Sequence, residues 1–325
     1  MHNSFGSHFR VEIWGASHTP EMGVRLVGVP CGVALCEEDF AEDILRRKPC
    51  GTHATSRIEE DVPTIVSGLS DGYTTGEPLE ILFQNSNVRS SDYDEFRYHP
   101  RPSHADFVAL RKYGAEADLR GGGVFSGRMT LLLVVAGVVA KKILKSVEYN
   151  TRIVEIAGSR NSEEFISIVA SAKQDGDSVG GVIECRASGV EAGLGEPFFD
   201  SVESIISHLM FSVPAVKGIE FGSGFEGVRL RGSQRNDCII DSEGHTATNN
   251  EGGINGGISN GNELVVRVAL KPTPSIAREQ MTFNMVEGKL LPLTIKGRHD
   301  SCILYRAMVV VEAVVAIALA ELSLQ

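Results

Sequence analysis

Positive charge is in short supply in this sequence. Of its 325 residues, 31 are Lys or Arg and 42 are Asp or Glu, so the formal net charge at pH 7 is −11. General nucleic-acid binders and proteins that lie on anionic membranes are normally basic, so we expect neither kind of partner. An acidic chain can still bind a small anion where its arginines converge.

Cysteine pairs and metal-binding motifs are also missing. The six cysteines include no CxxC pair and form no dense framework, and the nine histidines form no HExxH pattern. In a chain of this length, scattered cysteines indicate reduced thiols in a cytoplasmic protein. The pattern of histidines and cysteines predicts no metal site.

A leader and a membrane span are not evident either. The N-terminus, MHNSFGSHFRVEIWG, has no basic start followed by an apolar run, so we expect no signal peptide. TLLLVVAGVVAKKILK reaches two lysines after about ten apolar residues, too few to cross a bilayer. LYRAMVVVEAVVAIALAELSL carries Glu312 and Glu321 and fits a buried helix with a polar edge. Both apolar runs therefore predict core helices.

The order of predicted elements indicates an α+β fold in a single domain, residues 1–325. It is neither a steady strand–helix alternation nor an all-β pattern, and it contains no short repeat and no linker. Antiparallel sheets packed on helices are the architecture that fits. Strands are predicted in 9–35 (two, around a loop), 49–85, 180–190, 215–227 and 262–272, and helices over 37–48, 105–114, 129–146, 200–211 and 303–322.

Three glycine-rich stretches differ in what they predict. GSGFEG, 222–227, matches GxGxxG, but the strand-like VRLRGSQ follows it where a dinucleotide site needs a helix, so we reject that interpretation. RGGGVFSGRMT, 120–130, precedes a helix that Ser126 or Thr130 can cap; it is either an anion site or a tight turn. EGGINGGISNGN, 251–262, fits a packed loop against a flat ligand better than a linker.

Three loops each present a histidine beside arginine, serine or aspartate. They are WGASHTP with His18, RPSHAD with His104, and KGRHDSC with His299. A lone histidine is usually structural, but imidazole is the side chain best suited to proton transfer near neutral pH, and a nearby carboxylate can orient it. The two prolines around Arg101 hold their neighbours in place without regular structure.

Taken in order, these and further stretches resemble chorismate synthases along nearly the whole chain. The resemblance implies a β–α–β sandwich, with helices between antiparallel sheets, assembled as a homotetramer. It also implies a lyase that converts 5-enolpyruvylshikimate 3-phosphate to chorismate and phosphate, the last step of the shikimate pathway toward aromatic amino acids. The stretches are FRVEIWGASH, ILRRKP, SGLSDGYTTGEPLEI, RPSHAD, KYG, RGGGVFSGR, FSVPAVKGIEFGSGF, GGINGGISNG, ALKPTPSI and KGRHDSC.

The resemblance assigns roles in a 1,4-anti elimination that needs reduced FMN without net redox change. His18 would act as an acid toward the departing phosphate, and His104 would protonate or hold the reduced flavin. Ser17, Ser126 and Asp300 would form a proton relay. Guanidinium groups suit the substrate's oxyanions because they bind them in pairs. The substrate residues would be Arg47, Arg57, Arg101, Arg128 and Arg298, and the flavin residues Val124, Phe125, Ser126, Gly256, Lys271, Pro272, Thr273, Pro274, Ser275 and Arg298.

Several positions depart from the family pattern. The family usually has GESHG and RSSARET where this chain has GASHT and VFSGRMT, so weaker flavin binding is expected. Two alternatives stay open: a non-catalytic or weakly active relative that binds flavin or another anionic ligand, and a flavin-dependent redox enzyme. NADPH is a candidate reductant only. The departing residues are Ala16, Thr19, His53, Val124, Gly127, Met129 and Pro214.

Overall fold

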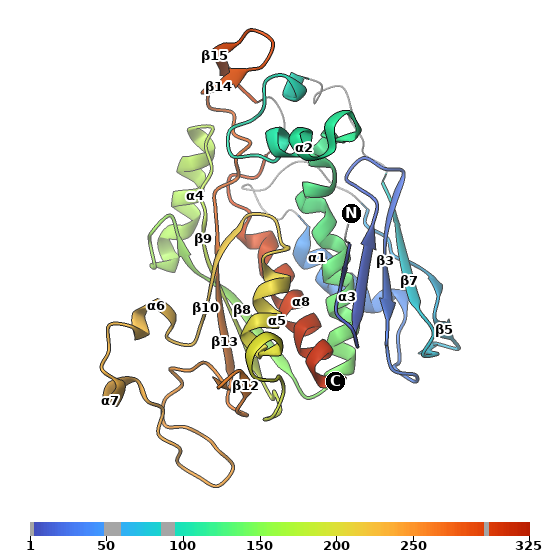
Figure 1. Cartoon of the computed structure of the whole chain (residues 1–325), viewed down its shortest axis with the longest axis vertical. Coiled ribbons are helices and arrows are strands. Elements are labelled where there is room, and N and C mark those ends of the chain that lie inside the picture. Colours follow the sequence, from blue (N-terminus) through green and yellow to red (C-terminus); the bar gives the residue numbers. More distant parts are fainter. Residues whose placement is uncertain (1–2, 49–59, 86–94, 296–298) are drawn as a thin grey trace.

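Two antiparallel sheets enclose a layer of helices in the computed structural model (Figure 1). The structure describes residues 3–48, 60–85, 95–295 and 299–325. One sheet has the order β1-β2-β3-β7-β4 and the other β10-β13-β9-β8. The first contains β1 Ser4–Phe5, β2 Arg10–Trp14, β3 Glu21–Val27, β4 Thr64–Ser67 and β7 Leu79–Gln84, and the second β8 Glu148–Ile156, β9 Gly181–Ser188, β10 Val216–Phe221 and β13 Leu264–Leu270. The predicted α+β sandwich is confirmed.

Smaller elements complete the chain. The hairpins are β5 Leu69–Ser70 with β6 Tyr73–Thr74, β11 Ile254–Asn255 with β12 Ile258–Ser259, and β14 Gln280–Asn284 with β15 Lys289–Leu293. The α-helices are α1 Ala41–Arg47, α2 Asp106–Tyr113, α3 Thr130–Ile143, α4 Phe165–Gln174, α5 Val202–Met210, α6 Gly224–Gly227, α7 Gly232–Arg235 and α8 Leu304–Ser323. The 3₁₀ turns are η1 Glu37–Phe40, η3 Gly114–Glu116, η4 Arg120–Phe125, η5 Gly127–Met129, η6 Ser162–Glu164 and η7 Phe198–Asp200.

Alternation of apolar and polar residues explains why the strands face as they do. In β7, Leu79, Ile81 and Phe83 are buried while the residues between them are not. Successive side chains of a strand point to opposite faces, so this pattern turns one face of the sheet toward the helices.

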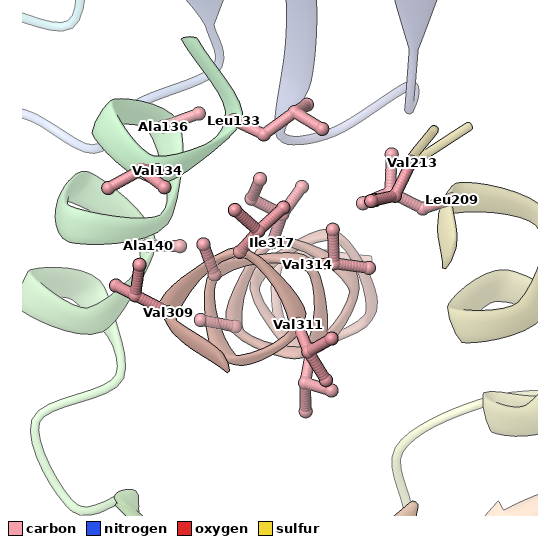
Figure 2. Packing of buried hydrophobic residues seen from close by; sticks show 14 of the residues in the cluster. Leu133, Val134, Ala136, Ala140, Leu209, Val213, Val309, Val311, Val314 and Ile317 are labelled. Atoms are coloured by element: carbon pink, nitrogen blue, oxygen red, sulfur yellow. The ribbon is translucent and has the colours of Figure 1, made fainter. Parts of the chain in front are cut away.

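The helices α3 and α8 form the centre of the core. Both are apolar on every side, and nearly all of α8 is buried. A helix of that kind needs cover all round, which the two sheets and α5 supply. Figure 2 shows α8 between α3 and the α5 region, with Val314 and Ile317 among Ala140, Leu209 and Val213.

The two glutamates of α8 lie inside the protein rather than on a polar edge facing solvent. Glu312 accepts hydrogen bonds from Arg46 at 2.7 and 2.8 Å and from Lys141 at 2.5 Å. Glu321 accepts three backbone N–H groups of residues 7–9 at 2.6 to 3.0 Å, which joins the two ends of the chain. Buried carboxylates are tolerated when they are paired in this way.

Most predicted elements are present with shifted ends, and a few were missed. The helix predicted over 129–146 ends at Ile143, and GSGFEG forms one helical turn, Gly224–Gly227. Strand β8, helix α4 and the hairpin β14–β15 had no counterpart in the sequence prediction. Among the described residues, no helix is long and apolar enough to cross a membrane.

We predict that Gly137→Ala destabilises the protein, although alanine is the better helix former by about 1 kcal/mol. A Cβ at position 137 of α3 would lie 2.4 Å from the Cβ of Ala313 in α8, so the helices would have to separate. Overpacking of this kind costs about 1–3 kcal/mol. The free energy of unfolding in urea is the measurement. Gly232→Ala is the control, because a Cβ at that helical position meets no atom within 4 Å; equal effects of both would refute the packing argument.

Candidate active site

A cleft of about 820 Å³ lies where α3 and α8 begin. Thr130, the first residue of α3, lines it, as do Ile303 and Arg306 from the start of α8. In Figure 1 the helices α3 and α8 begin at the end of the helix layer nearer α2. Helix amino ends carry partial positive charge and unsatisfied N–H groups, so the cleft favours an anion.

Most of the residues singled out from the sequence meet in this cleft. Ser17 lies just behind it, and Pro272 is not among the lining residues although both of its neighbours are. Arg57, Arg298 and the departing residue His53 fall outside the described residues. The predicted residues that line the cleft are His18, Arg47, Arg101, His104, Val124, Phe125, Ser126, Arg128, Lys271, Thr273, Pro274, Ser275 and Asp300.

Gly256 is placed elsewhere, in the turn between β11 and β12, and is not among the residues that line the cleft. Ile254 in the same stretch is buried, and the next glycine, Gly257, accepts the N–H of Val202 at 2.9 Å at the start of α5. The expectation of a packed loop rather than a linker is confirmed, while a flat ligand against this loop stays a prediction. Its packing partner in this chain is a helix end.

The glycine loop 121–123 separates the two histidine-bearing segments. All three glycines have positive φ, between 54° and 84°. A Cβ on Gly121 would lie 2.1 Å from Cε1 of His18 and 2.7 Å from Oγ of Ser17, so no other residue fits. A Cβ on Gly122 would lie 3.8 Å from Cε1 of His104. The turn is therefore tight and at the same time part of the cleft wall.

Ser126 begins the helical segment that follows the glycines. Its Oγ accepts the N–H of Arg128 at 3.3 Å and caps η5, which runs directly into α3. Thr130 donates through Oγ1 to the carbonyl of Gly127 at 2.6 Å. Ser126 thus caps the 3₁₀ turn before the long helix, whereas α3 itself begins after Met129 without a side-chain cap, so the prediction of a cap on the long helix holds only for the turn before it.

Asp106, which the sequence analysis did not single out, organises the RPSHAD loop. Its Oδ1 lies 2.8 Å from Nδ1 of His104 and accepts from Nη2 of Arg101 at 2.6 Å, while Oδ2 accepts from Nε of Arg101 at 2.7 Å. A carboxylate is the stronger partner for Nδ1 than the guanidinium Nη2 at 3.0 Å. Nδ1 therefore carries the proton, and Nε2 is left for chemistry.

Charge interactions set the protonation of Asp106. Burial by itself raises the pKa of this carboxyl, but hydrogen bonds from Arg101 and His104 outweigh burial and hold its pKa well below the ordinary value. Asp106 therefore stays ionised across the neutral range. The signal that could have identified it was its place two residues after His104 in the same motif.

Arg101 acts mainly as a structural arginine. Besides Asp106, it donates from Nη1 to Oγ of Ser275 at 3.2 Å and packs over the ring of Phe96, 4.3 Å from the centroid. Lys271 donates from Nζ to the carbonyl of Ser103 at 2.8 Å. The hydrogen bonds to Ser275 and from Lys271 join the KPTPS stretch to the RPSHAD loop.

Arg47 is buried and held in place by the turn before α3. It donates from Nη2 to the carbonyls of Gly127 at 3.0 Å and Arg128 at 3.1 Å, and from Nε to Oγ1 of Thr130 at 3.2 Å. Burial, together with the nearby Arg306 and Arg128, lowers the pKa of Arg47 to about 9. It remains a cation at neutral pH, in surroundings that favour an additional anion.

Asp300 lines the same cleft and is joined to Arg47 through Arg306. Arg306 donates from Nη1 to Oδ2 of Asp300 at 2.6 Å and from Nε to the carbonyl of Arg47 at 3.1 Å. Arg306 was not predicted, because nothing in the apolar helix 303–322 marked it as a site residue.

Positively charged side chains predominate in the cleft wall, although the chain as a whole has a net charge of −11. The cations in the cleft wall are Arg47, Lys48, Arg101, Arg128, Lys217, Lys271 and Arg306, and the carboxylates are Asp61 and Asp300. Apolar residues such as Val124, Phe125 and Pro214 form the rest of the wall. The cleft therefore suits a multiply charged anion next to a flat apolar group. Among the described residues, no group of three or more possible ligands is placed to hold a metal ion.

Comparison with known proteins agrees with this geometry. The family model described as chorismate synthase matches residues 9–324. A chorismate synthase of Chitinophaga pinensis is 53% identical over 323 residues, covering 99% of this chain and 96% of that protein. The chorismate synthase of Korarchaeum cryptofilum is 41% identical over 346 residues, covering 98% and 96%.

A solved structure leads to the same family. A crystal structure of a chorismate synthase superimposes with a TM-score of 0.75 at 28% identity, covering 98% of this chain and 92% of that one. Sequence and structure match over nearly the whole chain, and the chain belongs to the chorismate synthase family.

Proposed function

We propose that this chain converts 5-enolpyruvylshikimate 3-phosphate to chorismate and phosphate by 1,4-anti elimination in the cleft at the amino ends of α3 and α8. Membership of the family supports the reaction. The observation that carries the proposal is that His18 and His104, from segments far apart in the sequence, both line one cation-rich cleft with the glycine loop between them.

The cations supply the binding energy for the substrate, which carries a phosphate and two carboxylates. Arg47 and Arg128 lie together where α3 begins, so helix dipole and guanidinium groups act in the same direction on a phosphate. Arg101 contributes indirectly, because Nε, Nη1 and Nη2 donate to Asp106 and Ser275.

The two imidazoles have separate tasks. His18 would protonate the phosphate oxygen as the C–O bond breaks, which makes phosphate a better leaving group. His104, with Nδ1 held by Asp106, would present Nε2 toward the glycine loop and keep the reduced cofactor in its required protonation state. Ser17, Ser126 and Asp300 would accept and pass on the proton that leaves the ring.

The residues present fit a reduced FMN. The buried hydroxyl of Thr273 has no hydrogen-bond partner in the part of the chain that the structure describes, although this residue lines the cleft. Val124, Phe125, Ser126 and the 271–275 stretch would hold the ring. When bound, reduced FMN supplies electron density to the substrate and a basic nitrogen, and NADPH would serve only to reduce it.

Five of the departures from the family pattern divide into two groups. Ala16 and Met129 are buried and do not line the cleft, whereas Val124, Gly127 and Pro214 do. The first group therefore alters packing, and only the second alters contacts with ligands. This division argues for an active enzyme with weaker flavin binding rather than a non-catalytic relative.

We further infer a single domain over residues 1–325, assembled as a cytoplasmic homotetramer without nucleic-acid or membrane partners. One hydrophobic cluster reaches from β3 and β7 through α3 and α8 to β9 and β13, which supports one domain. The resemblance to the family supports the tetramer.

The direct test is an anaerobic assay of phosphate release with chemically reduced FMN. Release of phosphate and formation of chorismate are expected. The same assay with NADPH and oxidised FMN tests whether the protein reduces its own flavin. Absence of phosphate release under the first condition, at saturating FMN, would overturn the proposed activity.

His104→Ala is expected to lower kcat by ~10²–10⁴-fold, the usual contribution of a placed acid or base. Folding should change little, because Arg101 still binds Asp106 in the variant. His245→Ala is the matched control: its Nδ1 lies 2.7 Å from Oδ2 of Asp241 in an exposed loop that does not line the cleft. Activity of the His104 variant near that of the control would contradict the assignment.

Asp106→Asn is expected to lower kcat by about 10²-fold, because the amide can no longer hold His104 in one orientation and tautomer. Stability against acid should also change. The folded-state pKa of Asp106 lies below its unfolded value, so its contribution is present above about pH 4 and is lost as pH falls further. Acid unfolding should therefore be less steep in the variant. Asp241→Asn is the control, because Asp241 pairs with His245 outside the cleft. A pH–rate profile of Asp106→Asn that equals the wild-type profile would count against the positioning role of Asp106.

A further inference from the structure

We infer that Asp61 is a positioning residue that sets the spacing and orientation of Arg47 and Arg128 for the substrate's phosphate. The inference rests on the proposed function. No motif in the sequence marked Asp61, and its neighbours in sequence carry acidic and apolar side chains. It lines the cleft and is buried, with 6% of its surface exposed.

Asp61 bridges the two arginines with its two oxygens. Oδ1 accepts from Nη1 of Arg128 at 2.8 Å, and Oδ2 lies 3.6 Å from Nη1 of Arg47. The arginines come from the end of α1 and from η5, so the carboxylate joins two separate segments of the wall.

The remaining donors of both arginines are largely committed, which makes Asp61 the contact that completes their alignment. Arg47 is held by backbone carbonyls of η5, and Nε of Arg128 donates to Oδ1 of Asn85 at 2.7 Å. Nη2 of Arg128 is buried and has no hydrogen-bond partner among the described residues. With Asp61 on one side, this nitrogen is the donor left for an incoming oxyanion.

The local charge supports the same role. Burial lowers the pKa of Arg47 most, the neighbouring guanidinium groups of Arg306 and Arg128 lower it further, and Asp61 raises it. A single carboxylate at 61 reduces the repulsion between two buried guanidinium groups without neutralising both. The excess positive charge remains for a phosphate.

The backbone at Asp61 is adapted to this position. Its φ is +52°, a left-handed conformation that aspartate and asparagine tolerate better than other non-glycine residues. Lys48, next to Arg47, donates from Nζ to the carbonyl of Glu60 at 2.8 Å, so the segment is tied to the end of α1. Asp61→Asn therefore keeps size and backbone while it removes the charge and one acceptor.

The test compares Asp61→Asn with Asp71→Asn. Asp71 has φ of +51° but is exposed in the β5–β6 turn and does not line the cleft, so it is a matched control for the backbone. We expect Asp61→Asn to raise KM for the phosphorylated substrate, and the dissociation constant of inorganic phosphate measured by calorimetry, by ~10-fold or more, with a smaller change in kcat. The control should bind phosphate as the wild type does.

Two outcomes would overturn the inference. Unchanged phosphate binding in Asp61→Asn would show that the arginines are aligned without the carboxylate. Tighter binding would show that Asp61 acts only as a competing negative charge, since removing an anion next to an anion site strengthens binding by Coulomb's law alone. If Asp61→Asn does not fold, Asp61→Glu replaces it. The glutamate keeps the charge but displaces it by one methylene, and wild-type phosphate affinity in that variant would equally overturn the role.

Phosphate calorimetry also separates this inference from the proposed function. It needs neither flavin nor turnover. A wild type that releases no phosphate from the substrate would refute the activity, while the comparison of phosphate affinities would still decide the role of Asp61.

Discussion

The burial of two helices that are apolar on every side is the constraint on which the rest of the structure depends. Since α3 and α8 have no polar face to show to water, a sheet must cover each side of their layer. Close approach at Gly137 and Ala313 brings the helices together with their first residues at the same end. The cleft forms there, so the packing of the core also places two helix amino ends in its wall.

Electrostatics then distinguishes this end of the layer from the remainder of an acidic protein. Cations gather in the cleft wall, and each of the principal ones is held by a carboxylate or by backbone carbonyls: Asp106 for Arg101, Asp61 for Arg128, and Asp300 for Arg306. Arginines that are aligned before a ligand arrives lose less conformational entropy on binding. The carboxylates thus serve the anion site by holding its cations in place.

The loops add the chemistry to this framework. Residues 121–123 are glycines with positive φ, so no side chain lies between His18 and His104 at this loop. Both imidazoles therefore line the same cleft. Family membership and the shared cleft both support the proposed function, although some residues that depart from the family pattern also line this cleft. The proposed proton carriers His18 and His104 lie on loops, and the departures that line the cleft are Val124, Gly127 and Pro214.

The sequence by itself determined the class of fold, the core helices and the family, because periodic apolar residues and contiguous motifs are local signals. It also identified His18 and His104, because each lies in a short motif with a glycine or a proline close by in sequence. Only the tertiary structure decided which charges meet. Asp61 and Arg128 are 67 residues apart, and no local pattern records that they share a hydrogen bond. The same holds for Gly256, whose glycine-rich stretch indicated a loop but not its place beside α5, since position in the fold comes from packing between distant segments.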